Sequence, residues 1–119
     1  MKLTLEQERP EAPANPMMFV FEAIVRRRCI GGTYNRQRMI LAPHILYTRH
    51  GALYLDAIIV SRESMLPRET KLGTFKVDGL SELRLIERAF EINPLFEPEA
   101  EKYVGVTVMK AEAELGEDA

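Results

Sequence analysis

Near the start of the chain, apolar residues recur with the period of a helix. Asn15 suits the N-cap of such a helix, and Pro16 suits its first position. Arg26, Arg27 and Arg28 fall in the last turn, where positive charge complements the helix dipole. The pattern predicts one amphipathic helix, whose buried stripe is Met17, Val20, Phe21, Ile24 and Val25.

From residue 29 onward the pattern is typical of short strands. The runs 29–34, 38–47 and 52–61 favour strands, and the turn at 48–51 predicts a hairpin between the last two. Pro43 has no N–H to donate to a neighbouring strand, so it marks an edge or a bulge. Strict alternation places Arg38, Ile40, Ala42, His44 and Leu46 on one face, and Met39, Leu41, Pro43 and Ile45 on the other.

The second half of the chain predicts smaller elements. We expect a loop at 62–70, short strands at 74–80 and 83–86, and a short helix at 98–103. One helix before four or five short strands predicts a fold that is mainly β with α, a small Sm- or SH3-like curved sheet or barrel preceded by one N-terminal helix. The expected organisation is a flexible leader at 1–14, a single domain at 15–105 and an acidic C-terminal tail at 106–119.

Charge is unevenly distributed along the chain, although the net charge is only −2. Residues 26–76 carry ten Lys/Arg against three Asp/Glu, a net charge of +7. Residues 77–119 carry four against eleven, a net charge of −7. The basic middle indicates an anionic ligand or partner. The alternative is that the two regions neutralise each other in the folded protein.

Residues for the common catalytic and metal sites are scarce. One cysteine, Cys29, and two histidines, His44 and His50, are too few for a zinc site of the usual kind. The chain has no phosphate loop of the Walker type and no nucleophile elbow. Cys29 with His44, or Asp56 with Asp78, are the alternatives for catalysis, and packing or surface roles are more ordinary for such residues. We expect no catalytic residue, no metal and no cofactor, and therefore no enzyme.

The cellular compartment is predicted from features that the sequence lacks. No apolar run reaches the length of about eighteen residues that a membrane span needs. The glutamate-rich start lacks the apolar stretch of a signal peptide, and a single cysteine allows no intramolecular disulfide. These observations predict a cytoplasmic protein.

Arginine and tyrosine side chains gather in the basic middle of the chain. A guanidinium group binds phosphate through a fork of N–H groups, and aromatic or guanidinium planes stack on bases. Structural roles are the alternative, since the tyrosines suit half-buried sheet positions and His44 suits the core. The candidate ligand-binding residues are Tyr34, Arg36, Arg38, His44, Tyr54, Arg62, Arg68 and Lys71.

Four segments share an order and a spacing. They read FEAIVRRRCIGGTY at 19–34, RMILAPHIL at 38–46, LYLDAI at 53–58 and GTFKVDGL at 73–80. This order resembles the WYL domain of bacterial transcription regulators and defence-associated proteins. That family runs from a short helix through a strand ending in Tyr, an Arg strand leading to Pro and the Trp-Tyr-Leu strand to an Arg- and Phe-rich strand. The similarity covers residues 17–96.

The resemblance implies a small barrel and a ligand-sensing role. WYL domains often follow a DNA-binding winged helix, and several sense single-stranded nucleic acid or nucleotide-like effectors. By position, Thr33 stands where the family often has Ser, and Tyr34, Arg38 and His44 match its polar binding positions. Leu53-Tyr54-Leu55 stands for the name-giving triplet, and Gly73 and Gly79 stand where the family has arginines.

Two functional hypotheses follow. The first is a regulatory sensor that binds single-stranded nucleic acid or a nucleotide-like anion and acts with a separate DNA-binding protein. The second is a protein-interaction or homodimerisation module that has lost the ligand site, which Gly73 and Gly79 favour. A closed two-fold dimer would be the simplest assembly for this second hypothesis.

Overall fold

The computed structural model describes residues 17–113. The leader predicted at 1–14, the capping residues Asn15 and Pro16, and residues 114–119 lie outside this range. Among the described residues, no helix has the length and apolarity needed to cross a membrane. Residues 17–113 form one helix followed by a six-stranded antiparallel sheet, which confirms the prediction of a mainly β fold with an N-terminal helix.

Helix α1 (Met17–Arg26) packs one face against the sheet. Its buried residues are Val20, Ala23 and Ile24, with Met17 and Phe21 packed partly against them. Val25 was expected on this stripe, but 68% of it is exposed. Ala23 is fully buried on this face although it was not part of the predicted stripe.

The helix ends earlier than its three arginines suggest. Only Arg26 lies in the last turn, where it forms an ion pair with Glu22 at 2.6 Å. Arg27 has a φ of 55°, a left-handed conformation that ends a helix, and Arg28 already begins the first strand. The prediction that all three arginines belong to the last helical turn was therefore wrong for Arg27 and Arg28.

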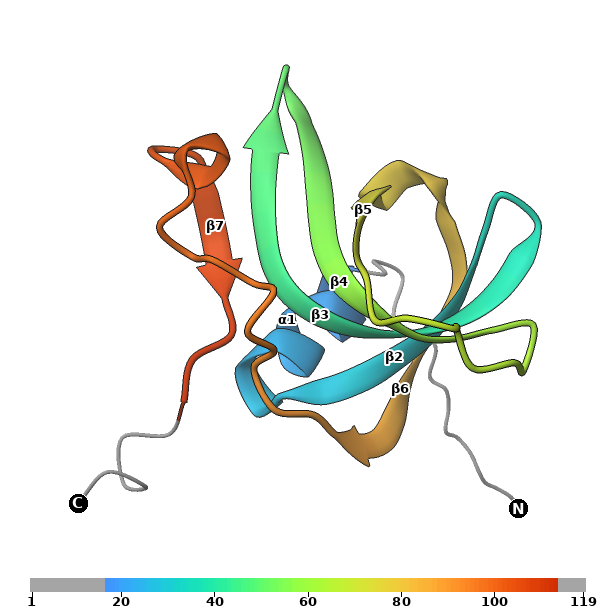
Figure 1. The fold of residues 1–119 in the computed structure, drawn as a ribbon. Helices are drawn as coiled ribbons and strands as arrows, with labels where there is room; N and C mark the ends of the chain where they lie inside the picture. Colours follow the sequence, from blue (N-terminus) through green and yellow to red (C-terminus); the bar gives the residue numbers. More distant parts are fainter. Residues whose placement is uncertain (1–16, 114–119) are drawn as a thin grey trace, which may run out of the picture.

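The sheet is curved and does not close (Figure 1). Its main path runs β5-β4-β3-β2-β6, and β7 pairs with β3 beside this path. Since all of these pairings are antiparallel, short turns can connect neighbouring strands. The strands are β2 (Arg28–Tyr34), β3 (Gln37–Arg49), β4 (Ala52–Arg62), β5 (Leu72–Lys76), β6 (Leu80–Ala89) and β7 (Thr107–Lys110).

The turns of two hairpins have the same backbone geometry. Asn35 and Arg36 join β2 to β3, and His50 and Gly51 join β3 to β4, all with positive φ. A two-residue loop with both φ values positive matches the twist of the flanking strands. The hairpin predicted between 38–47 and 52–61 is thus confirmed, with a two-residue turn at 50–51 in place of the predicted turn at 48–51.

A bulge in β3 changes which face each residue occupies. Pro43 pairs with Ala57 and Ile45 pairs with Asp56, so His44 is an extra residue on the β3 side. Leu46 therefore joins the core of Met39 and Leu41. The strict alternation predicted for 38–47 was wrong beyond Pro43, although the bulge itself agrees with the prediction made for this proline.

The same bulge marks where β3 changes partner. Before Pro43, β3 pairs with β2, and after it, from Ile45 to Tyr47, β3 pairs with β7. Residues 107–110 are therefore a strand and not part of an acidic tail. β7 forms here because the second half of β3 would otherwise have an unpaired edge.

The remaining elements differ from their predictions in kind or length. The run expected as a strand at 74–80 is β5 followed by a 3₁₀ turn, η1 (Val77–Gly79). The strand expected at 83–86 is longer and begins at Leu80. The short helix expected at 98–103 is a single 3₁₀ turn, η2 (Glu101–Tyr103).

Candidate ligand-binding groove

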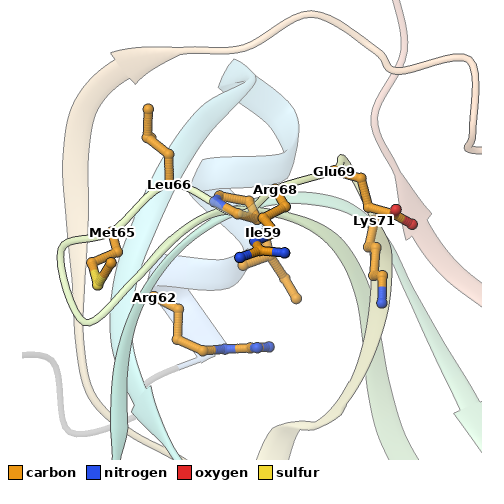
Figure 2. Close-up of a pocket in the computed structure, with 8 residues that line it drawn as sticks. Ile59, Arg62, Met65, Leu66, Arg68, Glu69 and Lys71 are labelled. Carbon is orange, nitrogen blue, oxygen red and sulfur yellow. The ribbon is translucent and has the colours of Figure 1, made fainter.

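A groove of about 510 Å³ lies where β4 ends and the chain turns toward β5. Figure 2 shows the side chains of Arg62, Arg68 and Lys71 grouped around Ile59. Three of the arginine and lysine residues predicted from the sequence are thus brought together. We call this the basic groove, and its residues are Ile59, Arg62, Met65, Leu66, Pro67, Arg68, Glu69 and Lys71.

Backbone hydrogen bonds hold both ends of the loop that forms the groove. At the start, Arg62 and Met65 exchange two N–H···O bonds of 2.9 Å across the turn Glu63-Ser64. At the end, the Ile59 N–H donates to the Lys71 carbonyl at 3.2 Å. The loop is therefore fixed to β4 at two points, which positions the cations on either side of Ile59.

The groove is positively charged and partly apolar. It contains three cationic side chains against one carboxylate, Glu69. Within residues 17–113, the side chains of Arg62, Arg68 and Lys71 form no ion pair or hydrogen bond. Met65 and Leu66 are 71% and 78% exposed, so they add apolar surface beside these unpaired cations.

Tyr34 does not line the groove and is committed to packing. Its ring packs edge-on against Phe75 at 5.0 Å, and its hydroxyl accepts a hydrogen bond from the Lys76 N–H at 3.2 Å. A Cβ on Gly79 would come within 2.9 Å of the Tyr34 ring, and one on Gly73 within 3.1 Å of the Phe75 ring. Aromatic rings thus fill the space at both glycines that stand for arginines in the WYL resemblance.

Three other predicted residues lie along β2 and β3. Thr33 is half-buried, and its hydroxyl donates to Glu82 at 2.9 Å. Arg36 is exposed at the tip of the β2–β3 turn. Arg38 is exposed and lines a second, smaller hollow together with Arg84. None of the three lines the basic groove.

Arg84 was missed by the sequence analysis. It lies on β6 opposite Gly31 of β2, and its guanidinium covers that glycine. The sequence signal for such a residue was the Gly31-Gly32 pair, because a glycine in a strand leaves room for a side chain of the adjacent strand to lie over its backbone. The pairing of β2 with β6, over fifty residues apart in sequence, could not be inferred from that pair.

His44 is buried and both ring nitrogens are occupied. Nδ1 lies 2.8 Å from the Ala42 carbonyl, and Nε2 accepts the Asn93 N–H at 3.0 Å. Because Nε2 accepts, Nδ1 must carry the proton, which fixes one neutral tautomer. Burial lowers the pKa of His44, against the opposing effect of the hydrogen bond to Ala42. The ring ties the bulge of β3 to the C-terminal segment and offers no free nitrogen to a ligand.

Tyr54 lies far along the β3–β4 hairpin, beside a buried carboxylate. It stacks on Tyr47, whose hydroxyl donates to Asp56 at 2.8 Å. Asp56 also accepts hydrogen bonds from the Tyr103 hydroxyl and, at 3.0 Å, from the Lys102 ammonium group. Three donors therefore satisfy the buried Asp56, and they anchor the segment around η2 to the hairpin.

This network is structural in character. Desolvation by burial and the hydrogen bond to Asp56 raise the pKa of both Tyr47 and Tyr103, which keeps the two phenols protonated. Burial also raises the pKa of the Cys29 thiol, which is fully buried. Among the described residues, no three His, Cys, Asp or Glu side chains are grouped as a metal site.

Comparison of the chain with family models, with curated proteins and with solved structures finds no match.

Proposed function

We propose that the protein is a ligand-sensing binding module that holds a nucleotide-like anion or a short stretch of single-stranded nucleic acid in the basic groove. The observation that carries this proposal is the convergence of three unpaired cations, Arg62, Arg68 and Lys71, on one hollow. Charged groups without a partner at the surface are the usual binding elements for phosphate.

The size and lining of the groove suit such a ligand. Small-molecule sites span roughly 300–1,000 Å³, and the groove, at about 510 Å³, falls within this range. The guanidinium groups of Arg62 and Arg68 can each form a fork to a phosphate oxygen pair or stack on a base. Ile59 and Met65 supply apolar contact beside them.

The proposed role is binding and not catalysis. The WYL-like order of segments supports a regulatory sensor, which would act in the cytoplasm together with a separate DNA-binding protein. In this proposal the candidate residues divide by role. Arg62, Arg68 and Lys71 contact the ligand, while Tyr34, His44 and Tyr54 support the fold in other parts of the sheet.

The test is fluorescence anisotropy of labelled short single-stranded DNA and RNA. Arg62→Ala and Lys71→Ala should each weaken binding by about tenfold, because a hydrogen bond to a charged group is worth about 1.5–3 kcal/mol. The control is Arg49→Ala, which removes the same charge at the far end of the β3–β4 hairpin.

Salt dependence provides a second readout of the same proposal. Three phosphate contacts on a single strand predict that log K falls against log salt with a slope of about −2. Binding that does not change with salt, or that Arg49→Ala weakens as much as Arg62→Ala does, would contradict the proposal.

The alternative function is a protein-interaction or homodimerisation module. The observation in its favour is that the rings of Tyr34 and Phe75 fill the space at Gly79 and Gly73. Met65 and Leu66 also expose apolar surface next to the groove. Under this alternative, the groove residues would contact a protein and not a nucleotide.

A further inference from the structure

A second hollow, of about 180 Å³, lies on the opposite face of the sheet from the basic groove. We call it the two-arginine hollow, and its residues are Arg38, Met39, Ile40, Ser61, Ser64 and Arg84. The strand register establishes the opposite face. Arg62 of the groove pairs with Met39, whose side chain is in the core, whereas Ser61 pairs with Ile40, whose side chain packs on the outer face.

Four strands contribute to one row across this outer face. Arg84 of β6 pairs with Gly31 of β2, Gly31 pairs with Ile40 of β3, and Ile40 pairs with Ser61 of β4. Paired residues in an antiparallel sheet lie on the same face. The row therefore brings the Arg84 side chain and the Ser61 hydroxyl to the two sides of Ile40, with Arg38 two residues away on the same strand.

Gly31 is what allows Arg84 to reach the hollow. A Cβ at position 31 would lie 2.7–2.9 Å from three atoms of the Arg84 guanidinium. The guanidinium thus lies flat over the backbone of β2 and extends toward β3. Any side chain at position 31 would displace the Arg84 head group while leaving its charge in place.

The turn after β4 supplies the last residue of the hollow. Glu63 and Ser64 have φ values of 51° and 67°, a left-handed backbone conformation that is unfavourable for residues other than glycine. Two hydrogen bonds hold the turn against β3. The Glu63 N–H donates to the Arg38 carbonyl at 2.7 Å, and the Arg38 N–H donates to the Glu63 carboxylate at 2.8 Å. The strained turn is thereby fixed with Ser64 next to Arg38.

We propose that the two-arginine hollow is a site for a phosphate group, either inorganic phosphate or the phosphate of a small monoester. Within residues 17–113, the guanidinium groups of Arg38 and Arg84 form no ion pair or hydrogen bond. Two guanidinium forks with two serine hydroxyls match the acceptor oxygens of a phosphate. At about 180 Å³ the hollow is below the usual size of a drug-like site, which favours a small anion.

The test is a titration of the full chain with inorganic phosphate at constant ionic strength, followed by amide NMR shifts. Saturable shifts are expected at Gly31, Arg38, Ser61, Ser64 and Arg84. Arg84→Ala should weaken the apparent affinity by about tenfold or more. Gly31→Ala should also weaken it several-fold, because it displaces the Arg84 head group without removing charge.

The control is Arg88→Ala, which removes the same charge from an exposed position four residues along β6 and should leave the phosphate affinity unchanged. Equal losses in Arg84→Ala and Arg88→Ala would overturn the site in favour of general charge attraction. Absence of saturable shifts, or shifts confined to Arg62, Arg68 and Lys71, would also overturn it. Arg62→Ala should leave phosphate binding in the hollow intact, so the two proposals stand or fall separately.

Discussion

At the scale of single residues, the surroundings of a polar side chain decide its role. His44 and Arg38 both match binding positions in the WYL resemblance. The bulge of β3 buries His44 between the Ala42 carbonyl and the Asn93 N–H, whereas Arg38 remains exposed next to Arg84. The same match to a binding position thus corresponds to a packing role for His44 and to an exposed cation for Arg38.

His44 predicts a pH dependence of stability. Its pKa in the folded protein is lowered below the ordinary value of 6.5, so below that pH the unfolded chain binds more protons than the folded chain. The free energy of unfolding should therefore fall as the pH drops below 6.5, by up to about 1.4 kcal/mol per pH unit. Urea denaturation between pH 7.5 and 5.5, on the order of one pH unit either side of this value, measures it.

Two variants isolate the contribution of His44. His44→Gln should reduce the slope of stability against pH, because the buried titrating ring is removed. His50→Gln should retain the slope, since His50 is exposed at a turn. If His44→Gln and the unaltered protein show equal slopes, the buried imidazole is not the group responsible.

At the scale of elements, short turns determine the sheet. Asn35 and Arg36 occupy a turn in which both φ values are positive, although only glycine adopts these values without strain. Asn-Gly is the preferred pair for such a turn. The arginine at position 36 is therefore a less stable choice than glycine.

Arg36→Gly should stabilise the protein by about 0.5–1 kcal/mol, because it relieves a left-handed backbone at an exposed side chain. The midpoint of urea denaturation is the measurement. Ligand binding in the basic groove should not change, since Arg36 does not line it. An unchanged or lower midpoint would show that the Arg36 side chain makes a compensating interaction.

At the scale of the whole molecule, three strands of the sheet have an unpaired outer edge. Among the described residues, β5 pairs only with β4, β6 only with β2 and β7 only with β3. β3 lies between β2 and β4 in its first half and between β4 and β7 in its second. The two proposed functions therefore differ in what they predict for these outer edges. An interaction module pairs one of them with another chain, whereas a monomeric sensor leaves them unpaired.

For a monomeric sensor, hydrogen exchange should follow this order of pairing. Amides of β3 should exchange slowest, and amides on the outer edge of β5 should exchange at least about tenfold faster. Sedimentation in parallel should give the mass of one chain. Equal protection of β5 and β3 together with a dimeric mass would contradict the monomeric sensor and support the interaction module.

The local pattern was sufficient for much of the architecture. The helix, the β3–β4 hairpin and the bulge near Pro43 follow from hydrophobic period, strand propensity and the missing N–H of proline, all of which act over a few residues. The grouping of Arg62, Arg68 and Lys71 was foreshadowed by their position around one loop. These features depend only on interactions between residues that are close together in the sequence.

Only the tertiary structure decided which polar side chains are accessible to a ligand. β7 could not be recognised as a strand, because its partner is the part of β3 beyond the bulge, some sixty residues earlier. The pairing of β2 with β6 placed Arg84 over Gly31, and the register of β3 with β4 placed Arg38 beside Ser61 and away from the basic groove. Strand register and burial depend on contacts between distant segments, and no local property of the sequence specifies them.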